Sequence, residues 1–297
     1  MHVQRFLGSA WASVHGPKSP QALVVSILEE GFSGLAASPG PRPISWSAVR
    51  AASDDLPIQF ACVRAANPLA DRSALTSLCS QSDAERAVAH RAVTDAVNCA
   101  MTIGTQTVVL DLGVVGVHGD IEAEDVNEHN YTWSHERAQA LLARRKVGRN
   151  AFVDGACREL FAIIKSFPEM NFCVTQGRSL RAVLDLESMH DIVEDLGGRR
   201  LGYWHDAGIS ARREQILSEA QGEWLESFGN RLQGMTLGDA SGDGLYLPPG
   251  AGGVDYGLCA SYVPRVGNAF PVVLELDLSV APGEMAGMRS CLDKYGL

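Results

Sequence analysis

The chain has 297 residues, of which 46% are hydrophobic and 20% are charged, and its formal net charge at pH 7 is −10. This length and composition predict a soluble α/β protein with either one large domain or two ordinary ones. The negative net charge argues against a nucleic acid partner, because a phosphate backbone would be repelled.

Three further features of the sequence bear on its location. No run of 18 apolar residues is present, so no transmembrane helix is predicted. The stretch MHVQRFLGSAWASVHG has too short an apolar segment for a signal peptide and predicts a first strand instead. Seven cysteines, an odd number without a CxxC pair, predict reduced thiols rather than disulfides or zinc ligands. We therefore expect a cytoplasmic protein that does not bind membranes.

Short apolar runs alternate with helical patterns along the whole chain. Strands are predicted at 5–11, 31–38, 58–66, 106–113, 171–178, 201–208, 232–239 and 271–277. Helices are predicted at 19–31, 82–104, 149–167, 180–198, 212–232 and 282–296. Apolar runs of this kind suit strands covered on both faces, and no linker divides the repeat. The pattern favours a single (β/α)8 TIM barrel over residues 1–297, with an open doubly wound sheet as the alternative.

One segment, residues 114–148, is too long and too charged for a simple connection after the fourth strand. It contains His118, His129, Trp133 and His135. A long loop on the C-terminal face of a barrel is where a lid would lie. A solvated helical excursion is the other interpretation.

The C-terminal ends of the predicted strands carry polar side chains, and chemistry gathers there in a barrel. These side chains are Asp111, Gln176, Arg178, His205, Asp206, Thr236, Asp239, Glu275 and Asp277. An acid-rich rim with one arginine suits a ligand rich in hydroxyl groups, or a hard cation bound by oxygen atoms.

Two carboxylates at the strand ends are the strongest candidates for function. Asp206 is interpreted either as a functional carboxylate or as an ion-pair partner of Arg178. Glu275 lies in an apolar strand, where a buried carboxylate is costly unless it is paired or contacts a ligand.

Three other side chains have structural interpretations beside the functional ones. Trp204 packs between the barrel and the helix layer, or forms a platform for a sugar ring. His205 points away from Asp206 if the strand is regular, which predicts a structural role. Asp239 lies in the turn-forming sequence GDASGDG and caps a turn, or it binds the ligand.

The order of these residues resembles the xylose isomerase-like TIM-barrel superfamily, which includes sugar isomerases, sugar epimerases and endonuclease IV. In many bacterial members strand six reads Tyr-Trp-His-Asp-x-Gly-His-Ala, strand seven reads Gly-x-His-x-His-Asp before a Leu-Pro-Pro-Gly segment, and strand eight ends in Glu. The matching stretches here are GYWHDAGISA (202–211), GMTLGDASGDGLYLPPGAGGVDY (234–256) and VVLELD (272–277). The resemblance covers nearly the whole chain and implies the same barrel.

The resemblance also implies where a divalent metal would bind, and this sequence departs from that pattern. The four metal-ligand positions are Gln176, Asp206, Thr236 and Glu275. Only Asp206 and Glu275 retain the family's residue type. Further histidines of the family are replaced by Asp111, Ile209, Gly238 and Tyr246, and a glutamate is replaced by Ala251. Imidazole ligands favour Zn, Mn or Co, and Gln176 cannot act as a carboxylate base.

We therefore predict a sugar isomerase-like or epimerase-like barrel that has lost most of its metal ligands. It binds a sugar or polyol at its C-terminal face without a tightly held metal or other cofactor. The predicted catalytic residues are Asp206 and Glu275, and the predicted ligand-binding residues are Asp111, Gln176, Arg178, Trp204, Thr236 and Asp239.

Two other functions remain open from the sequence. The first is an active isomerase or epimerase that uses Asp206, Glu275 and Asp111 around Mg²⁺ or Mn²⁺, with the 114–148 segment as a lid. The second is a non-catalytic scaffold that presents its surfaces to a partner. The sequence does not indicate the ligand's identity or the oligomeric state.

Overall fold

Eight parallel strands close into a barrel whose order around the ring is β1-β10-β7-β6-β5-β4-β3-β2. The computed structural model describes residues 3–65, 77–116, 134–196, 200–242, 244–265, 267 and 269–297. The barrel strands are β1 (Val3–Gly8), β2 (Gly34–Ala37), β3 (Gln59–Arg64), β4 (Thr107–Leu110), β5 (Asn171–Thr175), β6 (Leu201–Asp206), β7 (Leu232–Leu237) and β10 (Phe270–Leu274). Parallel pairing of β1 with β10, Phe6 opposite Val273, closes the ring. The predicted (β/α)8 barrel is confirmed.

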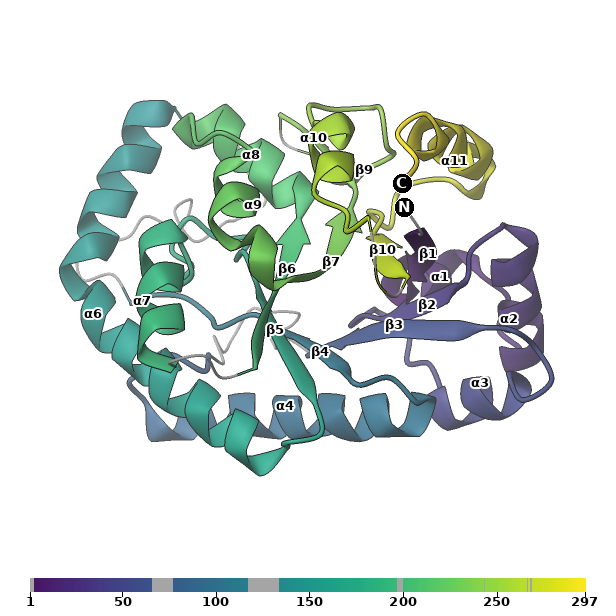
Figure 1. Cartoon of the computed structure of the whole chain (residues 1–297), viewed down its shortest axis with the longest axis horizontal. Helices are drawn as coiled ribbons and strands as arrows, with labels where there is room; N and C mark the ends of the chain where they lie inside the picture. The colour runs from purple at the N-terminus through teal and green to yellow at the C-terminus, as the bar shows by residue number, and fades with distance from the viewer. Residues whose placement is uncertain are drawn as a thin grey trace.

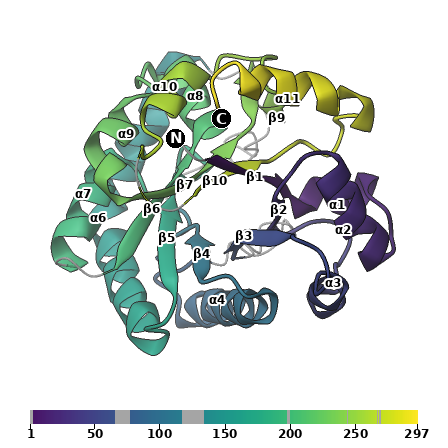
Figure 2. The same ribbon diagram turned by 45° about the vertical axis from the view of Figure 1, so that its right-hand side comes forward.

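The helices lie outside the ring of strands, as Figures 1 and 2 show. They are α1 (Ser9–His15), α2 (Pro20–Glu29), α3 (Trp46–Ala52), α4 (Asp83–Ile103), α6 (His135–Ser166), α7 (Leu186–Leu196), α8 (Ala207–Leu217), α9 (Glu223–Phe228), α10 (Tyr256–Ser261) and α11 (Met285–Asp293), with short 3-10 turns at Gly229–Arg231 and Pro282–Glu284. In the part of the chain that the structure describes, none of them has both the length and the apolar character needed to cross a membrane.

Local sequence signals explain where several helices begin and end. The side chain of Ser19 accepts a hydrogen bond from the backbone of Ala22, and Pro20 occupies the first helical position of α2. Ser82 caps α4 in the same way, and Gly104, at φ +80°, ends that helix. These signals were sufficient to place both helices from the sequence.

Other boundaries differ from the prediction. The first strand ends at Gly8, and Trp11, assigned to that strand, lies in α1. The helix predicted at 212–232 begins at Ala207, directly after β6, and ends at Leu217, so that α9 is a separate helix. In both places apolar residues continue past the strand, so hydrophobicity alone did not reveal where the backbone changes conformation.

The segment predicted as an excursion after the fourth strand is partly a helix. The helix expected at 149–167 begins at His135 and runs for 32 residues as α6. Residues 135–148 are therefore helical, whereas His118, His129 and Trp133 lie outside the described residues. The proposal that this segment forms a lid stays a prediction.

The alternating sides of the strands build two separate hydrophobic layers. The barrel interior is filled by Phe6, Ala36, Ala61, Cys62, Val109, Cys173, Trp204 and Val273. The outer sides of the strands pack against the helices, as Tyr203 does against Trp224 and Phe228 of α9. All seven cysteines are free, as expected, and five of them are buried. The filled interior leaves the C-terminal end of the barrel as the place for polar side chains.

A β-hairpin interrupts the repeat after β7. It consists of β8 (Asp239–Ser241) and β9 (Gly244–Leu247), which pair antiparallel. The backbone N–H of Asp277 donates to the carbonyl of Tyr246 at 2.8 Å, which ties the hairpin to the segment after β10. The hairpin thereby brings Tyr246 to the C-terminal end of the barrel.

Candidate functional site

Five side chains meet at the C-terminal end of the barrel, and we call them the barrel-mouth cluster: Arg64, Asp206, Thr236, Tyr246 and Glu275. Register explains part of the arrangement, because Asp206 lies opposite Thr236, and Thr236 lies opposite Val273, two residues before Glu275. Residues paired across parallel strands point to the same side of the sheet. Three strands therefore direct their polar ends to one place.

Asp206 is the fully buried centre of this cluster. Its Oδ1 accepts a hydrogen bond from the backbone N–H of Ile209 at 3.1 Å, which caps α8, and its Oδ2 accepts one from the Tyr246 hydroxyl at 2.8 Å. Nη2 of Arg64 lies 3.8 Å from the same Oδ2. Asp206 is thus both a helix cap and an ion-pair partner of Arg64, whereas the partner considered from the sequence was Arg178.

Arg64 is a member of the cluster that the sequence reasoning missed. It is the last residue of β3, and its Nη1 donates to Thr236 Oγ1 at 3.3 Å. Burial alone would lower the pKa of Arg64, but Tyr246, Asp206 and Glu275 outweigh it and raise that pKa, so the side chain stays cationic. The alternation of side chains along β3 could have predicted its orientation. Val63 faces the helices and Cys62 faces the interior, so Arg64 faces the interior as well.

Gln176 fixes the backbone beside Asp206. Its Oε1 accepts a hydrogen bond from the Asp206 backbone N–H at 2.9 Å, and its Nε2 donates to Ser210 Oγ at 2.7 Å. Both ends of the amide are used within the fold, and the side chain is 1% exposed. The ligand-binding role predicted for Gln176 stays a prediction. Its observed hydrogen bonds connect the end of β5 to β6 and α8.

Trp204 fills the interior of the barrel below the cluster. Its indole N–H donates to Thr236 Oγ1 at 2.9 Å, and the ring belongs to the interior hydrophobic layer. The expectation that it packs between the barrel and the helices is wrong, because the alternate positions of β6 face the interior. A Cβ on Gly234 would lie 2.4 Å from this ring, so the glycine makes room for it.

Glu275 lies directly after β10 and is 5% exposed. Its Oε2 accepts a hydrogen bond from the Ser38 hydroxyl at 3.0 Å. Burial raises the pKa of Glu275, while Arg64 and Ser38 oppose that rise. A Cβ on Gly8 would lie 2.5 to 2.8 Å from the carboxyl group, so only glycine lets β1 approach it this closely.

Tyr246 and Arg178 form the outer part of the site. Tyr246 has φ +60°, a left-handed conformation that is unfavourable for a residue with a large side chain. The guanidinium carbon of Arg178 lies 4.8 Å from the centre of its ring, a cation–π contact. Arg178 is exposed, and its pKa is raised chiefly by Tyr246. Backbone strain at Tyr246 is thus combined with two specific contacts of its side chain.

Two other predicted site residues serve the loops. Asp111 is partly exposed, and its Oδ1 accepts a hydrogen bond from the backbone N–H of Gly113 at 2.9 Å. Asp239 is fully buried and accepts hydrogen bonds from the backbone N–H groups of Ala240, Gly250 and Val254, each at 2.9 Å. The turn-capping interpretation of Asp239 agrees with these contacts, and its ligand-binding role stays a prediction.

His205 faces the helix layer, as the alternation of the strand predicts. Its Nδ1 lies 2.7 Å from the hydroxyl of Tyr203, and burial lowers its pKa to about 3. It is therefore neutral near pH 7 and does not belong to the barrel-mouth cluster.

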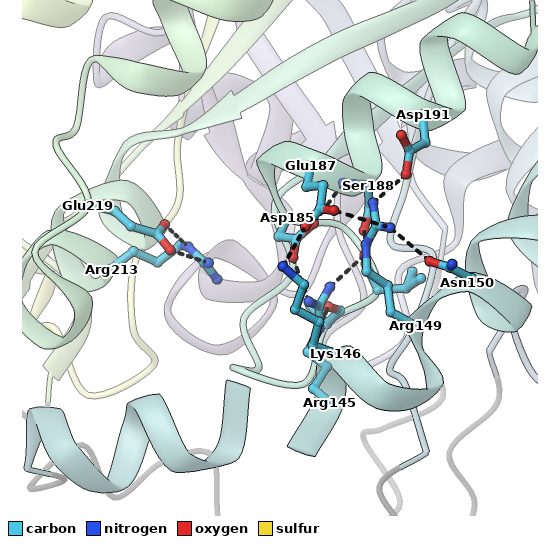
Figure 3. A network of polar contacts seen from close by, with 12 residues as sticks. Arg145, Lys146, Arg149, Asn150, Asp185, Glu187, Ser188, Asp191, Arg213 and Glu219 are labelled. Carbon is cyan, nitrogen blue, oxygen red and sulfur yellow. Dashed lines mark hydrogen bonds and ion pairs between the residues drawn. The ribbon is translucent and has the colours of Figure 1, made fainter. Parts of the chain in front are cut away.

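A second group of arginines fixes the loop that carries Gln176 and Arg178. Arg145 donates to the carbonyl oxygens of Ala182 and Val183 at 2.8 and 2.9 Å and to Asp185 Oδ2 at 2.5 Å. Arg149 binds Ser188 and Asp191 in the same way (Figure 3). Both arginines project from α6, so this helix holds the segment between β5 and α7 in place.

Comparison with known proteins identifies the fold. No protein-family model and no curated protein matches the sequence. Among solved structures, a D-tagatose 3-epimerase-like protein superposes with a TM-score of 0.70 at 16% identity, covering 99% of this chain and 97% of that one. A 3-keto-D-glucoside 4-epimerase from E. coli gives a TM-score of 0.64 at 11% identity, covering 98% and 99% of the two chains.

This chain has the TIM-barrel fold of these structures. The resemblance predicted from the sequence is confirmed at that level. An AP endonuclease of family 2 from Brucella melitensis also superposes, with a TM-score of 0.64 at 12% identity over 97% of each chain. Because an epimerase and an endonuclease share this barrel fold, the side chains of the site must decide the function.

The resemblance to the xylose isomerase-like barrels implies a divalent metal at four positions, of which only Asp206 and Glu275 supply a carboxylate here. Among the residues that the structure describes, no three His, Cys, Asp or Glu side chains come together as a metal ion would need. Thr236 Oγ1 already accepts hydrogen bonds from Trp204 and Arg64, and both the oxygen and the nitrogen of the Gln176 amide are hydrogen-bonded within the fold. The guanidinium of Arg64 brings a positive charge to Asp206, which would repel a divalent cation.

Proposed function

We propose that this protein binds a sugar or polyol at the C-terminal end of its barrel without a tightly held metal ion. The observation that carries the proposal is the position of Arg64, whose guanidinium contacts Asp206 and Thr236, two of the four positions where the resemblance implies metal ligands. In this protein a fixed organic cation supplies the positive charge. We further propose a cytoplasmic location, which the seven free cysteines support.

The chemistry of the site suits hydroxyl groups. Arg64 and Arg178 supply N–H donors, while Glu275, Asp111 and Tyr246 supply oxygen atoms, so both kinds of hydrogen-bonding partner are present. Two of the similar structures are a D-tagatose 3-epimerase-like protein and a 3-keto-D-glucoside 4-epimerase, which supports a carbohydrate as the ligand class. We propose neither a nucleic acid nor a membrane as a partner.

The test is calorimetric titration of the purified protein with neutral ketohexoses, D-sorbitol and inositol, with and without EDTA, alongside metal analysis. We expect binding that EDTA leaves unchanged and no stoichiometric metal. A variant Asp206→Ala should lose ligand affinity, whereas the control Asp54→Ala, which changes an exposed carboxylate, should not.

Two results would replace this proposal with one of the rivals. Stoichiometric metal that disappears in Asp206→Ala, together with metal-dependent exchange of a sugar C–H proton with deuterated water, would establish a metal-dependent isomerase or epimerase. Absence of binding to every carbohydrate, neutral or charged, would leave the scaffold function.

A further inference from the structure

Arg64 uses few of its hydrogen-bond donors within the fold. A guanidinium carries five N–H donors in a planar fork. Within the described part of the chain, Arg64 makes one hydrogen bond, to Thr236 at 3.3 Å. Its Nη2 lies 3.8 Å from Asp206 Oδ2, a distance that provides charge compensation but exceeds a hydrogen bond.

The neighbouring carboxylates do not need those donors, because other groups bind them. Asp206 accepts from the Ile209 backbone and the Tyr246 hydroxyl, and Glu275 accepts from Ser38. None of these three donors carries a charge. The two carboxylates thus lower the electrostatic cost of burying Arg64 without occupying its fork.

A second guanidinium lies close by. Tyr246 connects the two cations, since its hydroxyl binds Asp206 beside Arg64 and its ring lies beneath Arg178. The two arginines are near enough to oppose each other's charge, because Arg64 lowers the pKa of Arg178 against the stronger effect of Tyr246. Arg178 is exposed and Arg64 retains 15% of its side-chain surface, so a ligand can reach both.

We propose that the sugar or polyol bound here carries an anionic group, a carboxylate or a phosphate, and that Arg64 and Arg178 bind this group together. This inference rests on the proposed function and specifies its ligand class. Arginine forks match carboxylate and phosphate oxygens in two-point contacts, and an anion between the two cations relieves their mutual repulsion. In a protein with a net charge of −10, such a local pair of cations selects anions that the rest of the surface repels.

The experiment compares matched ligands by titration calorimetry. D-sorbitol and D-fructose are the neutral probes, D-gluconate supplies the carboxylate, and D-fructose 6-phosphate supplies the phosphate. Because charge-assisted hydrogen bonds exceed neutral ones by roughly 1.4 kcal/mol, we expect about tenfold tighter binding of at least one anionic probe. The anionic arm that gains the affinity identifies the source of the charge.

Variants locate the effect. Arg178→Met should reduce the affinity for the anionic probe to that of its neutral counterpart, and Arg64→Met should do the same. Arg178→Lys keeps the charge but loses the fork, so it should recover only part of the preference. The matched control is Arg50→Met, which removes an exposed arginine of α3 and should leave all affinities unchanged. Because Arg178 is exposed, its variants keep the test valid even if Arg64→Met does not fold.

The outcomes separate the inference from the proposed function. Neutral and anionic probes that bind equally well, or variants that weaken both kinds alike, would overturn the inference and leave the proposed function standing. Failure of all four probes to bind the unmodified protein would overturn both.

Discussion

Arg145 and Arg64 are both arginines that the fold encloses, but their surroundings differ. Arg145, on α6, is 3% exposed and uses Nε, Nη1 and Nη2 in hydrogen bonds to two backbone carbonyls and Asp185. Arg64, at the end of β3, makes one hydrogen bond of 3.3 Å and one ion-pair contact of 3.8 Å. All three guanidinium nitrogens are thus hydrogen-bonded in Arg145, whereas among the described residues only one is hydrogen-bonded in Arg64.

The difference separates structure from function. Arg145 is buried and each of its guanidinium nitrogens is hydrogen-bonded within the fold, so it acts on the site by holding the loop after β5. Arg64 leaves donors free within the described chain, and the cost of its burial is offset by charge rather than by hydrogen bonds. Unsatisfied donors in a polar end of a barrel therefore indicate a ligand better than the mere presence of charge.

The largest effect on stability is expected from Arg145→Met. It removes three hydrogen bonds and leaves two buried carbonyls and Asp185 without their partner, which should lower the free energy of unfolding by about 3–5 kcal/mol. Arg145 also holds the pKa of Asp185 below its ordinary range, against the effect of burial. Urea denaturation measures the loss, and a change below about 1 kcal/mol would remove the distinction between the two arginines.

Tyr246→Phe tests whether the Tyr246 hydroxyl keeps Arg64 from hydrogen-bonding to Asp206. It deletes the hydroxyl that donates to Asp206 at 2.8 Å and leaves the strained backbone in place. Hydrogen bonds to charged groups contribute about 1.5–3 kcal/mol, and we expect a loss in this range. A crystal structure of the variant should then show Arg64 within hydrogen-bonding distance of Asp206. If the 3.8 Å separation between Arg64 Nη2 and Asp206 Oδ2 persists, the hydroxyl of Tyr246 is not what keeps Arg64 from hydrogen-bonding to Asp206.

His205 extends the same rule to a side chain that is buried without a charged partner. Its folded-state pKa of about 3 lies below the ordinary 6.5, so the unfolded chain takes up a proton below pH 6.5 that the folded chain refuses. Stability should therefore fall as the pH drops from about 6.5 towards 3, by up to about 1.4 kcal/mol per pH unit. His205→Gln, which can still form a hydrogen bond with Tyr203, should show a shallower fall between pH 6.5 and 5.5 in denaturation curves. Identical slopes would contradict the prediction.

The sequence was informative about the barrel because the strands are covered on both faces. Eight continuous apolar runs identified the eight strands of the ring. The hairpin of β8 and β9 was missed, since its sequence GDASGDGLYL is short, polar and rich in glycine. The beginning of α6 at His135 was not located, although a helical excursion was one of the two interpretations of this segment, because its first half is highly charged and buries few apolar side chains.

The sequence predicted only some of the residues of the barrel-mouth cluster, for a different reason. Asp206 and Glu275 were found because they lie at the ends of strands with a recognisable motif, whereas Arg64 ends the third strand, where no motif is present. Tyr246 entered the sequence reasoning only as a replaced histidine. Its role depends on the hairpin, which brings the Tyr246 hydroxyl within 2.8 Å of Asp206 Oδ2. Asp206 lies 40 positions earlier in the chain, so no local sequence pattern predicts this contact.

The smallest effect is expected from Arg50→Met, which completes the series. Arg50 is 46% exposed and pairs with Asp54, itself 67% exposed, one helical turn further along the chain. Water and salt screen such a pair, and holding two long side chains together costs entropy, so exposed pairs contribute about 0.3–0.5 kcal/mol. The same Arg→Met change should therefore destabilise the protein by about 0.5 kcal/mol or less here, and 0.5 M NaCl should abolish the difference. A loss comparable to that of Arg145→Met would mean that removing any arginine destabilises this acidic protein through its net charge. The number of hydrogen bonds that each guanidinium makes would then no longer explain the difference in stability between the two variants.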